Sequence, residues 1–359
     1  MNSTNDISQG LICPIPLPHH NHIVIGHGSG GKLTQDLIAR SFTPLFENPI
    51  LNKGNDAGVI SIDIGVNNSN LRIAISTDSH VVWPLFFPGG DIGRLAICGT
   101  VNDVSMMGAK PLYITAGFIL EEGLEIDVLN QIVKSMKIAA QEAGVTIIAG
   151  DTKVVQKGKA DGLFINTTGV GILFSNSTVS GDYAQPGDVV ILSGSIGDHG
   201  IAVLQAREEL GIISNVVSDV APLNNLVKQI MQFGQDVHVL RDPTRGGLAT
   251  TLNEIACQSQ ICIEIEEDNI PIKPTVRSAC ELFGYDPLYI ANEGKLIAIT
   301  DKNIAQDTLN CMRNTKYGED AAIIGYIREE PRGRVLVRTA LGTTRVVSTL
   351  SGELLPRIC

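Results

Sequence analysis

The sequence of 359 residues has little of what marks nucleic-acid-binding and membrane proteins. Aromatic residues make up only 4% of it, which is too few for the stacking surfaces that hold single-stranded nucleic acids. The formal net charge is −11, and no block of basic residues faces a phosphate backbone. No apolar run approaches the roughly 20 residues that cross a bilayer. We therefore expect neither a nucleic acid nor a membrane among the partners.

Signals for export, zinc binding and lipid attachment are also missing. The first Lys or Arg is Lys32, so the charged start of a signal peptide is absent. The seven cysteines include no CxxC pair, and the spacing of Cys257 and Cys262 does not suit a zinc site. A prenylated cysteine would stand fourth from the end, where this chain has Pro356. These features favour a reduced, cytoplasmic protein.

Apart from residues 1–21, which lack periodicity and are expected to form a mobile extension, the chain alternates short β-branched runs with helical patterns. Strands are predicted over 22–26, 71–78, 145–152, 163–173 and 189–194, and helices over 93–109 and 124–144. Turn formers concentrate in 175–188, the best linker candidate. We predict a mixed α/β protein with an N-terminal domain over 22–178, a C-terminal α/β domain over 179–349 and a flexible tail over 350–359.

The segment "IVIGHGSGGKL" carries four glycines, Gly26, Gly28, Gly30 and Gly31. It satisfies the dinucleotide pattern GxGxxG, but the acidic partner about 20 residues further on is a poorly placed Glu47. It nearly satisfies the phosphate-binding P-loop, but Leu33 stands where Ser or Thr must bind magnesium. A plain flexible loop and a loop whose amides fold over phosphates both remain open.

Five aspartates stand at the ends of apolar segments or inside them: Asp56, Asp78, Asp103, Asp151 and Asp242. Asp56 and Asp78 would also suit turns, and Asp242 before Pro243 would suit a helix N-cap. Asp103 is different, because it lies inside an apolar helical pattern where an unpaired buried carboxylate is unfavourable. Carboxylates that converge at strand ends are what Mg²⁺ requires when it bridges to phosphate oxygens.

Three further features are ambiguous from the residues alone. Gly246 and Gly247 in "RDPTRGGL" would each cost about 1 kcal/mol inside a helix, so a helix is predicted to begin near them, with free amides that suit a phosphate. Glu293 lies between two apolar runs, either in a hairpin turn with Gly294 or as a general base. Lys153 either balances phosphate charge or is simply solvated.

Taken together, "GNDAGV", "STDS", "NDVSMMGAKP", "AGDT" and "DPTRGGL" resemble the aminoimidazole-ribonucleotide-synthetase superfamily of ATP-dependent enzymes, in that family's order from about 23 to 350. The ending "PRIC" resembles one branch, the carbamoyl dehydratases of nickel–iron hydrogenase maturation. The resemblance implies two α/β domains with ATP in the cleft between them. It also implies a homodimer that pairs through the N-terminal domain.

The resemblance assigns roles to matching residues. Mg²⁺ and the ATP phosphates would be held by Asp56, Asp78, Asp103 and Asp242, with Gly28, Gly30, Gly31, Gly246 and Gly247 near the phosphates and Asp151 beside them. Glu293, assisted by Lys153, would accept protons, and Cys359 would carry the carbamoyl group. Cys13 in the extension has no role in the family pattern.

The implied activity is ATP-dependent dehydration of a carboxamide on Cys359 to a thiocyanate. A carbamoyltransferase would load Cys359, and an iron-carrying hydrogenase assembly complex would accept the cyanide. One alternative is an enzyme of the same superfamily that acts on a free small molecule, as selenophosphate synthetase or a purine-pathway enzyme does. A second alternative is a carrier that holds cargo on Cys359 without ATP turnover. The third and weakest alternative is a dehydrogenase.

Overall fold

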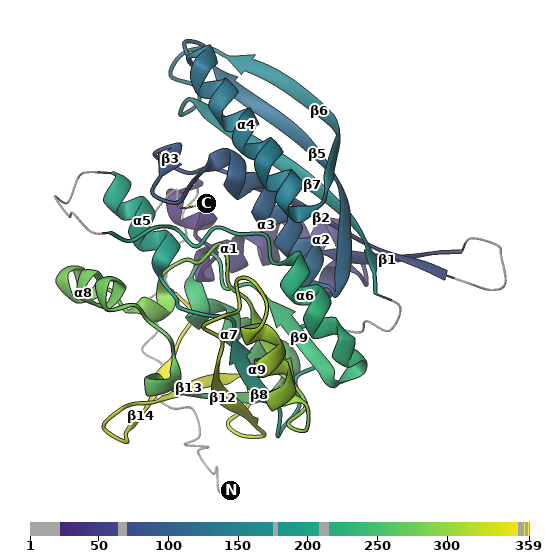
Figure 1. Cartoon of the computed structure of the whole chain (residues 1–359), viewed down its shortest axis with the longest axis vertical. Helices are drawn as coiled ribbons and strands as arrows, with labels where there is room; N and C mark the ends of the chain where they lie inside the picture. Colours follow the sequence, from purple (N-terminus) through teal and green to yellow (C-terminus); the bar gives the residue numbers. More distant parts are fainter. Residues whose placement is uncertain are drawn as a thin grey trace, which may run out of the picture.

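The computed structural model describes residues 22–63, 70–174, 179–207, 215–350, 355 and 358. The extension 1–21, part of the predicted linker and Cys359 lie outside these residues. Two large sheets organise the described chain, one formed before the predicted linker and one after it (Figure 1). In this part of the chain, no helix combines the length and apolarity needed to cross a membrane.

The first sheet has the strand order β1-β2-β7-β5-β6. Its strands are β1 (Gly58–Asp63), β2 (Asn70–His80), β5 (Ala109–Glu121), β6 (Thr146–Val155) and β7 (Leu163–Leu173). A short pair, β3 (Phe86–Phe87) and β4 (Gly90–Asp91), leads into helix α3 (Ile92–Met106), and α4 (Ile126–Ala143) follows β5. Within the described strands of this sheet, only β5 and β6 run parallel to each other, and α4 connects them.

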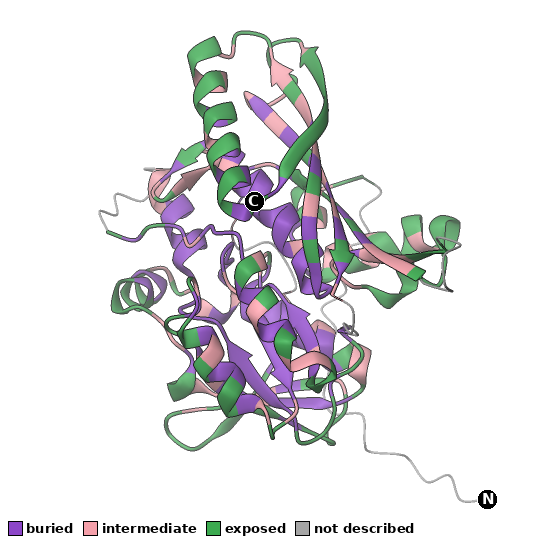
Figure 2. Ribbon diagram, turned by 45° about the vertical axis from the view of Figure 1, so that its right-hand side comes forward, coloured by how far each residue is buried: buried purple, intermediate pink, exposed green. Residues whose placement is uncertain are grey.

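Helix α3 lies between the first sheet, α4 and the second half of the protein (Figure 2). Asp91 begins it, because its Oδ1 accepts hydrogen bonds from the amides of Gly93 at 2.7 Å and Arg94 at 3.1 Å. The helix is buried along nearly its whole length. Asn102 donates to the Ala221 carbonyl at 3.1 Å and accepts from the Leu223 amide at 2.8 Å, so α3 joins both halves.

The second sheet has the order β14-β13-β10-β12-β8-β11-β9. Its strands are β8 (Val189–Leu192), β9 (Val237–Arg241), β10 (Cys262–Glu266), β11 (Ile297–Thr300), β12 (Ala322–Arg328), β13 (Arg334–Arg338) and β14 (Thr344–Val347). The associated helices are α5 (Asp198–Ala206), α6 (Asn224–Ile230), α7 (Gly247–Ser259), α8 (Pro274–Phe283) and α9 (Ala305–Arg313), with 3-10 turns at Met231–Asp236, Glu267–Asn269 and Pro287–Tyr289. Strands β8 and β11 are buried on both faces, within the buried centre of this half of the protein (Figure 2).

The predicted strand at 22–26 is wrong. Residues Ile25–Gly28 form a 3-10 turn, followed by α1 (Lys32–Leu37), a π-helical turn (Ile38–Phe42), α2 (Thr43–Phe46) and a 3-10 turn (Leu51–Lys53). Local hydrogen bonds favour the turn, because the Val24 amide donates to His27 Nδ1 at 3.0 Å and Ser29 Oγ donates to the Gly26 carbonyl at 2.8 Å.

The other elements predicted from periodicity are present. Strands are found over 71–78, 163–173 and most of 189–194, and helices over most of 93–109 and 124–144. Gly144 ends α4 in a left-handed conformation with φ of 69°, as the sequence predicts. Together with the two sheets, these elements confirm the predicted mixed α/β fold.

Candidate active site

Four of the predicted aspartates meet where the two halves of the protein face each other. Asp56 precedes β1, Asp78 lies on β2, Asp103 on α3, and Asp242 directly follows β9. Burial raises the pKa of Asp103 well above its ordinary value, and the neighbouring carboxylates of Asp242, Asp78 and Asp56 raise it further. We call these four residues the carboxylate cluster.

The pKa values of Asp242 and Asp56 are also raised by burial. Burial, with Asp56 and Asp78 nearby, raises the pKa of Asp242 to about 8. Burial also raises the pKa of Asp56 to about 6, although the Arg241 guanidinium opposes this. In each case loss of the proton is less favourable than for an ordinary aspartic acid, because several carboxylates share a volume that excludes water. The cluster is therefore a place where a cation would be strongly stabilised.

Ser76 and Arg241 fix the cluster's geometry, and sequence reasoning missed both. Ser76 Oγ lies 2.7 Å from Asp103 Oδ2 and 3.0 Å from the Asp56 carbonyl, which ties β2 to α3 and to the loop before β1. Arg241 is buried, with its Nε 2.9 Å from Asp56 Oδ1 and its Nη2 2.7 Å from Glu254 Oε2. The available signal was an arginine that ends the apolar run "VHVLR".

The glycine-rich loop lies against the loop that follows Asp242. A Cβ atom on Gly30 would stand 3.0 Å from the Cβ of Arg245, whose Nη2 lies 3.7 Å from Asp78 Oδ1. A Cβ on Gly31 would meet the Leu350 carbonyl oxygen at 2.5 Å, so this position requires glycine. The loop thus connects the phosphate-binding candidates with the root of the C-terminal tail.

Helix α7 begins at Gly247, as predicted, with Gly246 as its N-cap in a left-handed conformation of φ 78°. A Cβ on Gly246 would lie 2.2 Å from Thr250 Oγ1, so the tight turn requires glycine. The alternative in which Asp242 caps this helix is wrong, because the helix begins five residues later. The amide end of α7 instead follows the 242–246 loop, consistent with anion binding there.

Glu293 is 4% exposed, and the charges of carboxylate-cluster residues act on its carboxyl group. Burial raises the pKa of its carboxyl well above the ordinary value, and the charges of Asp242, Asp78 and Asp219 add to the shift. Within the described residues its Oε1 has no hydrogen-bond partner. Its amide donates to Asp219 Oδ1 at 3.1 Å, which holds the backbone in place. A buried carboxyl with one oxygen unpartnered among the described residues suits a general base.

The hairpin alternative for Glu293 is wrong, because the segment does not join two paired strands: Pro287–Tyr289 is a 3-10 turn and β11 begins only at Ile297. Position 294 requires glycine because another segment of the backbone passes close to it, and not because its φ is positive. A Cβ there would stand 1.7 Å from the Asp219 carbonyl oxygen.

Beyond Leu350, the C-terminal tail has two described residues, and both pack against the body of the protein. Ile358 is 6% exposed and belongs to the same apolar cluster as Phe87, Val220 and Ala291. Its carbonyl oxygen lies 2.7 Å from His199 Nε2. Leu355 packs partly against the same cluster. Cys359, the predicted carrier, lies outside the described residues.

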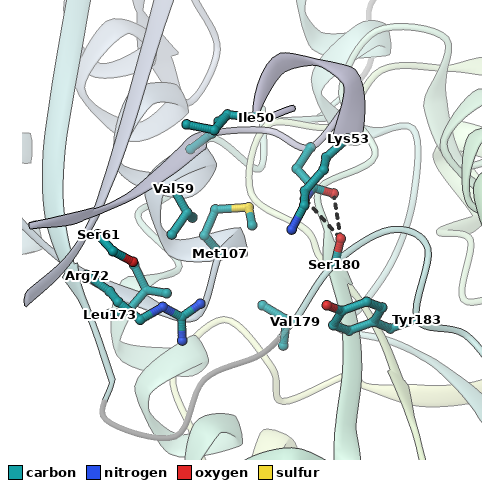
Figure 3. Close-up of a pocket in the computed structure, with 12 residues that line it drawn as sticks. Ile50, Lys53, Val59, Ser61, Arg72, Met107, Leu173, Val179, Ser180 and Tyr183 are labelled. Carbon is teal, nitrogen blue, oxygen red and sulfur yellow. Dashed lines mark hydrogen bonds between the residues drawn. The ribbon is translucent and has the colours of Figure 1, made fainter. Parts of the chain in front are cut away.

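A cavity of about 220 Å³ adjoins Asp56, whose neighbours Asn55 and Ala57 line it. Its wall combines apolar Val59 and Met107 with polar Lys53, Ser61, Arg72, Ser180 and Tyr183 (Figure 3). Asn55 Nδ2 donates to Ser180 Oγ at 3.0 Å, which closes the wall between the two halves of the protein. The cavity offers mixed polar and apolar surface beside the cluster.

Comparison with known proteins decides the family. The model for the AIR synthase related protein, N-terminal domain, matches residues 54–173, and the model for its C-terminal domain matches residues 185–338. The carbamoyl dehydratase HypE of Cupriavidus necator is 51% identical over 337 residues, which cover 94% of this chain and 95% of the relative. This chain belongs to the HypE family.

Solved HypE structures share the fold. A HypE structure in complex with ATP is 49% identical, with a TM-score of 0.77 over 94% of this chain and 100% of that chain. A HypE–HypF complex contains a chain that is 49% identical, with a TM-score of 0.82 over 88% of this chain and 99% of that chain. The family predicted from the motif order and the terminal "PRIC" is confirmed.

Two of the predicted site residues lie apart from the cluster in this member of the HypE family. Asp151 and Lys153 lie on β6, with 70% and 68% of their side chains exposed, and pair at 2.7 Å. Strands β7 and β5 separate β6 from β2, so one copy of the chain does not bring this pair to Asp78. The predicted strand end at Asp151 is wrong, because β6 continues to Val155 by pairing with β5.

Magnesium fits the carboxylate cluster as an ion that binds together with a phosphate-containing ligand. The described residues contain no group of three or more His, Cys, Asp or Glu that would hold a metal ion on its own. Asp56 Oδ2 and Asp242 Oδ2 are buried without hydrogen-bond partners in this part of the chain. Because Mg²⁺ is commonly held by one or two carboxylates plus phosphate oxygens and water, these donors suit a metal–phosphate ligand.

Proposed function

We propose that this protein is an ATP-dependent carbamoyl dehydratase that converts a carboxamide on its own Cys359 to a thiocyanate, from which the cyanide ligands of nickel–iron hydrogenase are supplied. The observation that carries the proposal is the position of the tail. Ile358, next to Cys359, binds His199, and His199 interacts electrostatically with Asp219, which holds the Glu293 amide. Ile358 is thereby linked through His199 and Asp219 to the segment that carries the buried Glu293, and Cys359 is the next residue in the sequence.

The reaction balances with ATP as the only co-substrate. The oxygen of the S-bound carboxamide attacks the γ-phosphorus, an O–P bond forms, and the bond from phosphorus to ADP breaks. The carbon then carries a phosphate ester, a better leaving group than the amide oxygen. Loss of the two nitrogen protons and departure of phosphate leave S–C≡N on the cysteine. The net result is one water removed from the carboxamide and one ATP hydrolysed.

The chain's own residues divide into phosphate-holding and proton-accepting groups. Asp56, Asp78, Asp103 and Asp242 would hold Mg²⁺ with the ATP phosphates, and a bound ion would supply positive charge against the transferring group. The start of α7 at Gly246 and Gly247 suits the phosphate oxygens. The Gly30 amide donates to Thr34 Oγ1 at 2.9 Å, so it would have to exchange that partner for a phosphate oxygen. Glu293 accepts a nitrogen proton, because a carboxylate with a raised pKa is a stronger base than an ordinary one.

The partners follow from the same chemistry. A carbamoyltransferase must load Cys359, and the solved HypE–HypF complex of a relative supports a partner of this kind. A hydrogenase assembly complex that carries iron would accept the cyanide. We also propose a cytoplasmic location, where thiols remain reduced and Cys359 stays available.

We further propose a homodimer, with the domain boundary at 178/179. Strand β6 is exposed on both faces, including Ile147, Ile148 and Val154 (Figure 2). An exposed apolar last strand is a site for association with another chain. A second copy packed there would also place Asp151 and Lys153 in an interface, where they would approach a site that they do not reach within one chain. Sedimentation equilibrium should give twice the mass of the chain.

The test is the intact mass of the full-length protein after loading with a carbamoyltransferase and carbamoyl phosphate, then after Mg-ATP. We expect one carboxamide on the C-terminal peptide, and the loss of one water only with hydrolysable ATP. Cys359→Ser is the matched control and should gain no stable adduct that loses water. If Cys359→Ser hydrolyses ATP at the wild-type rate and wild-type Cys359 never carries a carboxamide, the superfamily alternative with a free small-molecule substrate replaces this proposal.

A further inference from the structure

His199 is a buried histidine whose two ring nitrogens are both engaged. It lies in the first turn of α5 and is 0% exposed, with its ring edge-on to Phe87 at a centroid distance of 5.3 Å. Nδ1 lies 2.8 Å from Ser218 Oγ, and Nε2 lies 2.7 Å from the Ile358 carbonyl oxygen. The residue therefore connects the body of the protein to the last peptide bond of the chain.

The surrounding groups determine which ring nitrogen carries the proton. A carbonyl oxygen only accepts hydrogen bonds, so Nε2 carries the hydrogen that it donates to Ile358. Ser218 Oγ already accepts from the Val220 amide at 3.1 Å and is left to donate its own hydrogen to Nδ1. Burial lowers the pKa of His199, which agrees with a neutral ring. Ser218 thus orients the donor that faces the tail.

The residues around this contact also pack against the side chains of the tail. The Ser218 amide donates to the Pro88 carbonyl at 2.8 Å, which fixes Ser218 against the β3–β4 region. A Cβ atom on Gly200 would stand 3.4 Å from Leu355 Cδ1, an ordinary van der Waals distance, so the tail lies beside α5. Leu355 and Ile358 both pack against the apolar cluster that contains Phe87. The tail is thus held by apolar contacts and by one specific main-chain hydrogen bond.

We propose that His199, oriented by Ser218, is a positioning residue that latches the tail in its inward position through the Ile358 carbonyl. A main-chain carbonyl is the same whatever group Cys359 carries, so the latch holds the free thiol, the carboxamide and the thiocyanate alike. Because consecutive Cα atoms are about 3.8 Å apart, fixing Ile358 restricts the travel of Cys359. The latch therefore sets the ratio of two states of the tail. In the inward state Ile358 is bound to His199, and in the outward state this contact is broken and partners can reach Cys359.

The role of the latch in turnover rests on the proposed function, whereas the latch contact does not. Its test is the rate at which iodoacetamide alkylates Cys359 in the full-length protein, followed by peptide mass mapping. No ATP or carbamoyl donor is present, so the alkylation rate tests the latch contact even if the dehydratase proposal is wrong. His199→Phe keeps a ring beside Phe87 but removes both nitrogens. We expect alkylation of Cys359 to rise about tenfold, the change in population that about 1.4 kcal/mol produces.

Three further variants separate a latch from a structural histidine. His199→Gln retains an N–H donor near the position of Nε2 and should remain within about threefold of the wild-type rate, given that a donor is kept. Ser218→Ala does not alter the atoms that bond the tail, but it frees the ring to adopt the other tautomer, and should give an intermediate increase. His238→Phe is the matched control, because His238 Nδ1 lies 2.7 Å from Asp188 Oδ2 in the second half of the protein. It should leave the rate unchanged.

The latch is overturned if His199→Phe and Ser218→Ala both alkylate Cys359 at the wild-type rate. It is equally overturned if His238→Phe raises the rate as much as His199→Phe does. Buried Cys98 and Cys280 report unfolding in the same maps. Should His199→Phe expose them, Ser218→Ala alone decides: an increase confined to Cys359 supports the latch, and no increase removes it.

Discussion

Asp242 and Asp151 are the same residue type next to apolar runs, but they occupy opposite environments. Asp242 is 8% exposed, and burial with neighbouring carboxylates raises its pKa to about 8. Asp151 lies on exposed β6, where hydrogen bonding to Lys153 lowers its pKa. The comparison shows that an acidic residue at the end of an apolar segment acquires its chemistry from its surroundings. Buried like charges favour a bound cation, whereas an exposed ion pair is already neutralised by its partner.

The largest effect is expected on the buried side of this comparison. Glu293→Gln keeps the shape of the side chain but removes the base. The rate of water loss from the Cys359 carboxamide should fall about 10²- to 10⁴-fold, while loading continues and the carboxamide persists in Mg-ATP. Intact-mass time courses measure both steps.

Glu264→Gln is a suitable control for Glu293→Gln, because Glu264 forms an ion pair with Arg328 at 2.9 Å on the second sheet. It should dehydrate normally. Dehydration by Glu293→Gln at the control rate would remove Glu293 from the mechanism.

A second prediction concerns the pH dependence of stability without nucleotide. The folded-state pKa of Asp242, about 8, lies above its ordinary value of 3.8, so between these values the folded state binds more protons than the unfolded state. Its contribution to the free energy of unfolding is full below about pH 4 and is lost as the pH rises towards 8. Asp242→Asn, which does not titrate there, should flatten this decline.

At pH 8 Asp242→Asn should melt above the wild type by at least ~2 °C, corresponding to about 1 kcal/mol in a protein of this size. Asp151→Asn serves as the exposed counterpart and should leave the pH profile nearly unchanged. Thermal unfolding at pH 5 and pH 8 measures both variants. If Asp242→Asn melts well below the wild type at pH 8, Asp242 is charged and paired in the folded state, and the contrast with Asp151 fails.

The smallest effect on stability is expected from Lys153→Ala. Its ion pair with Asp151 is mostly exposed and screened by water, so the melting temperature should change little, and still less in high salt. Activity should nevertheless fall if a second copy carries Lys153 to the site. Calorimetry and the mass assay test these outcomes separately, and Lys137→Ala on α4 is the matched surface control. A normal dehydration rate in Lys153→Ala would confine the site to the residues of one copy.

Local signals predicted a large part of the fold. The apolar spacing of Leu95, Cys98 and Val101 indicated α3, and Gly144 marked the end of α4. Paired glycines at 246 and 247 marked the start of α7. The same reasoning failed at 22–26, where β-branched residues resembled a strand. Hydrogen bonds from Ser29 and to His27 favour a 3-10 turn there.

The sequence by itself determined the family, because five short motifs and the ending "PRIC" stand in a fixed order, and it determined which residue types the site contains. Only the tertiary structure decided that Asp103, Asp242 and Glu293 share one buried volume while Asp151 does not. It also decided that His199 meets Ile358, across a sequence separation of 159 residues. The physical reason is that burial, charge repulsion and tautomer depend on neighbours brought from distant segments, which no local pattern contains.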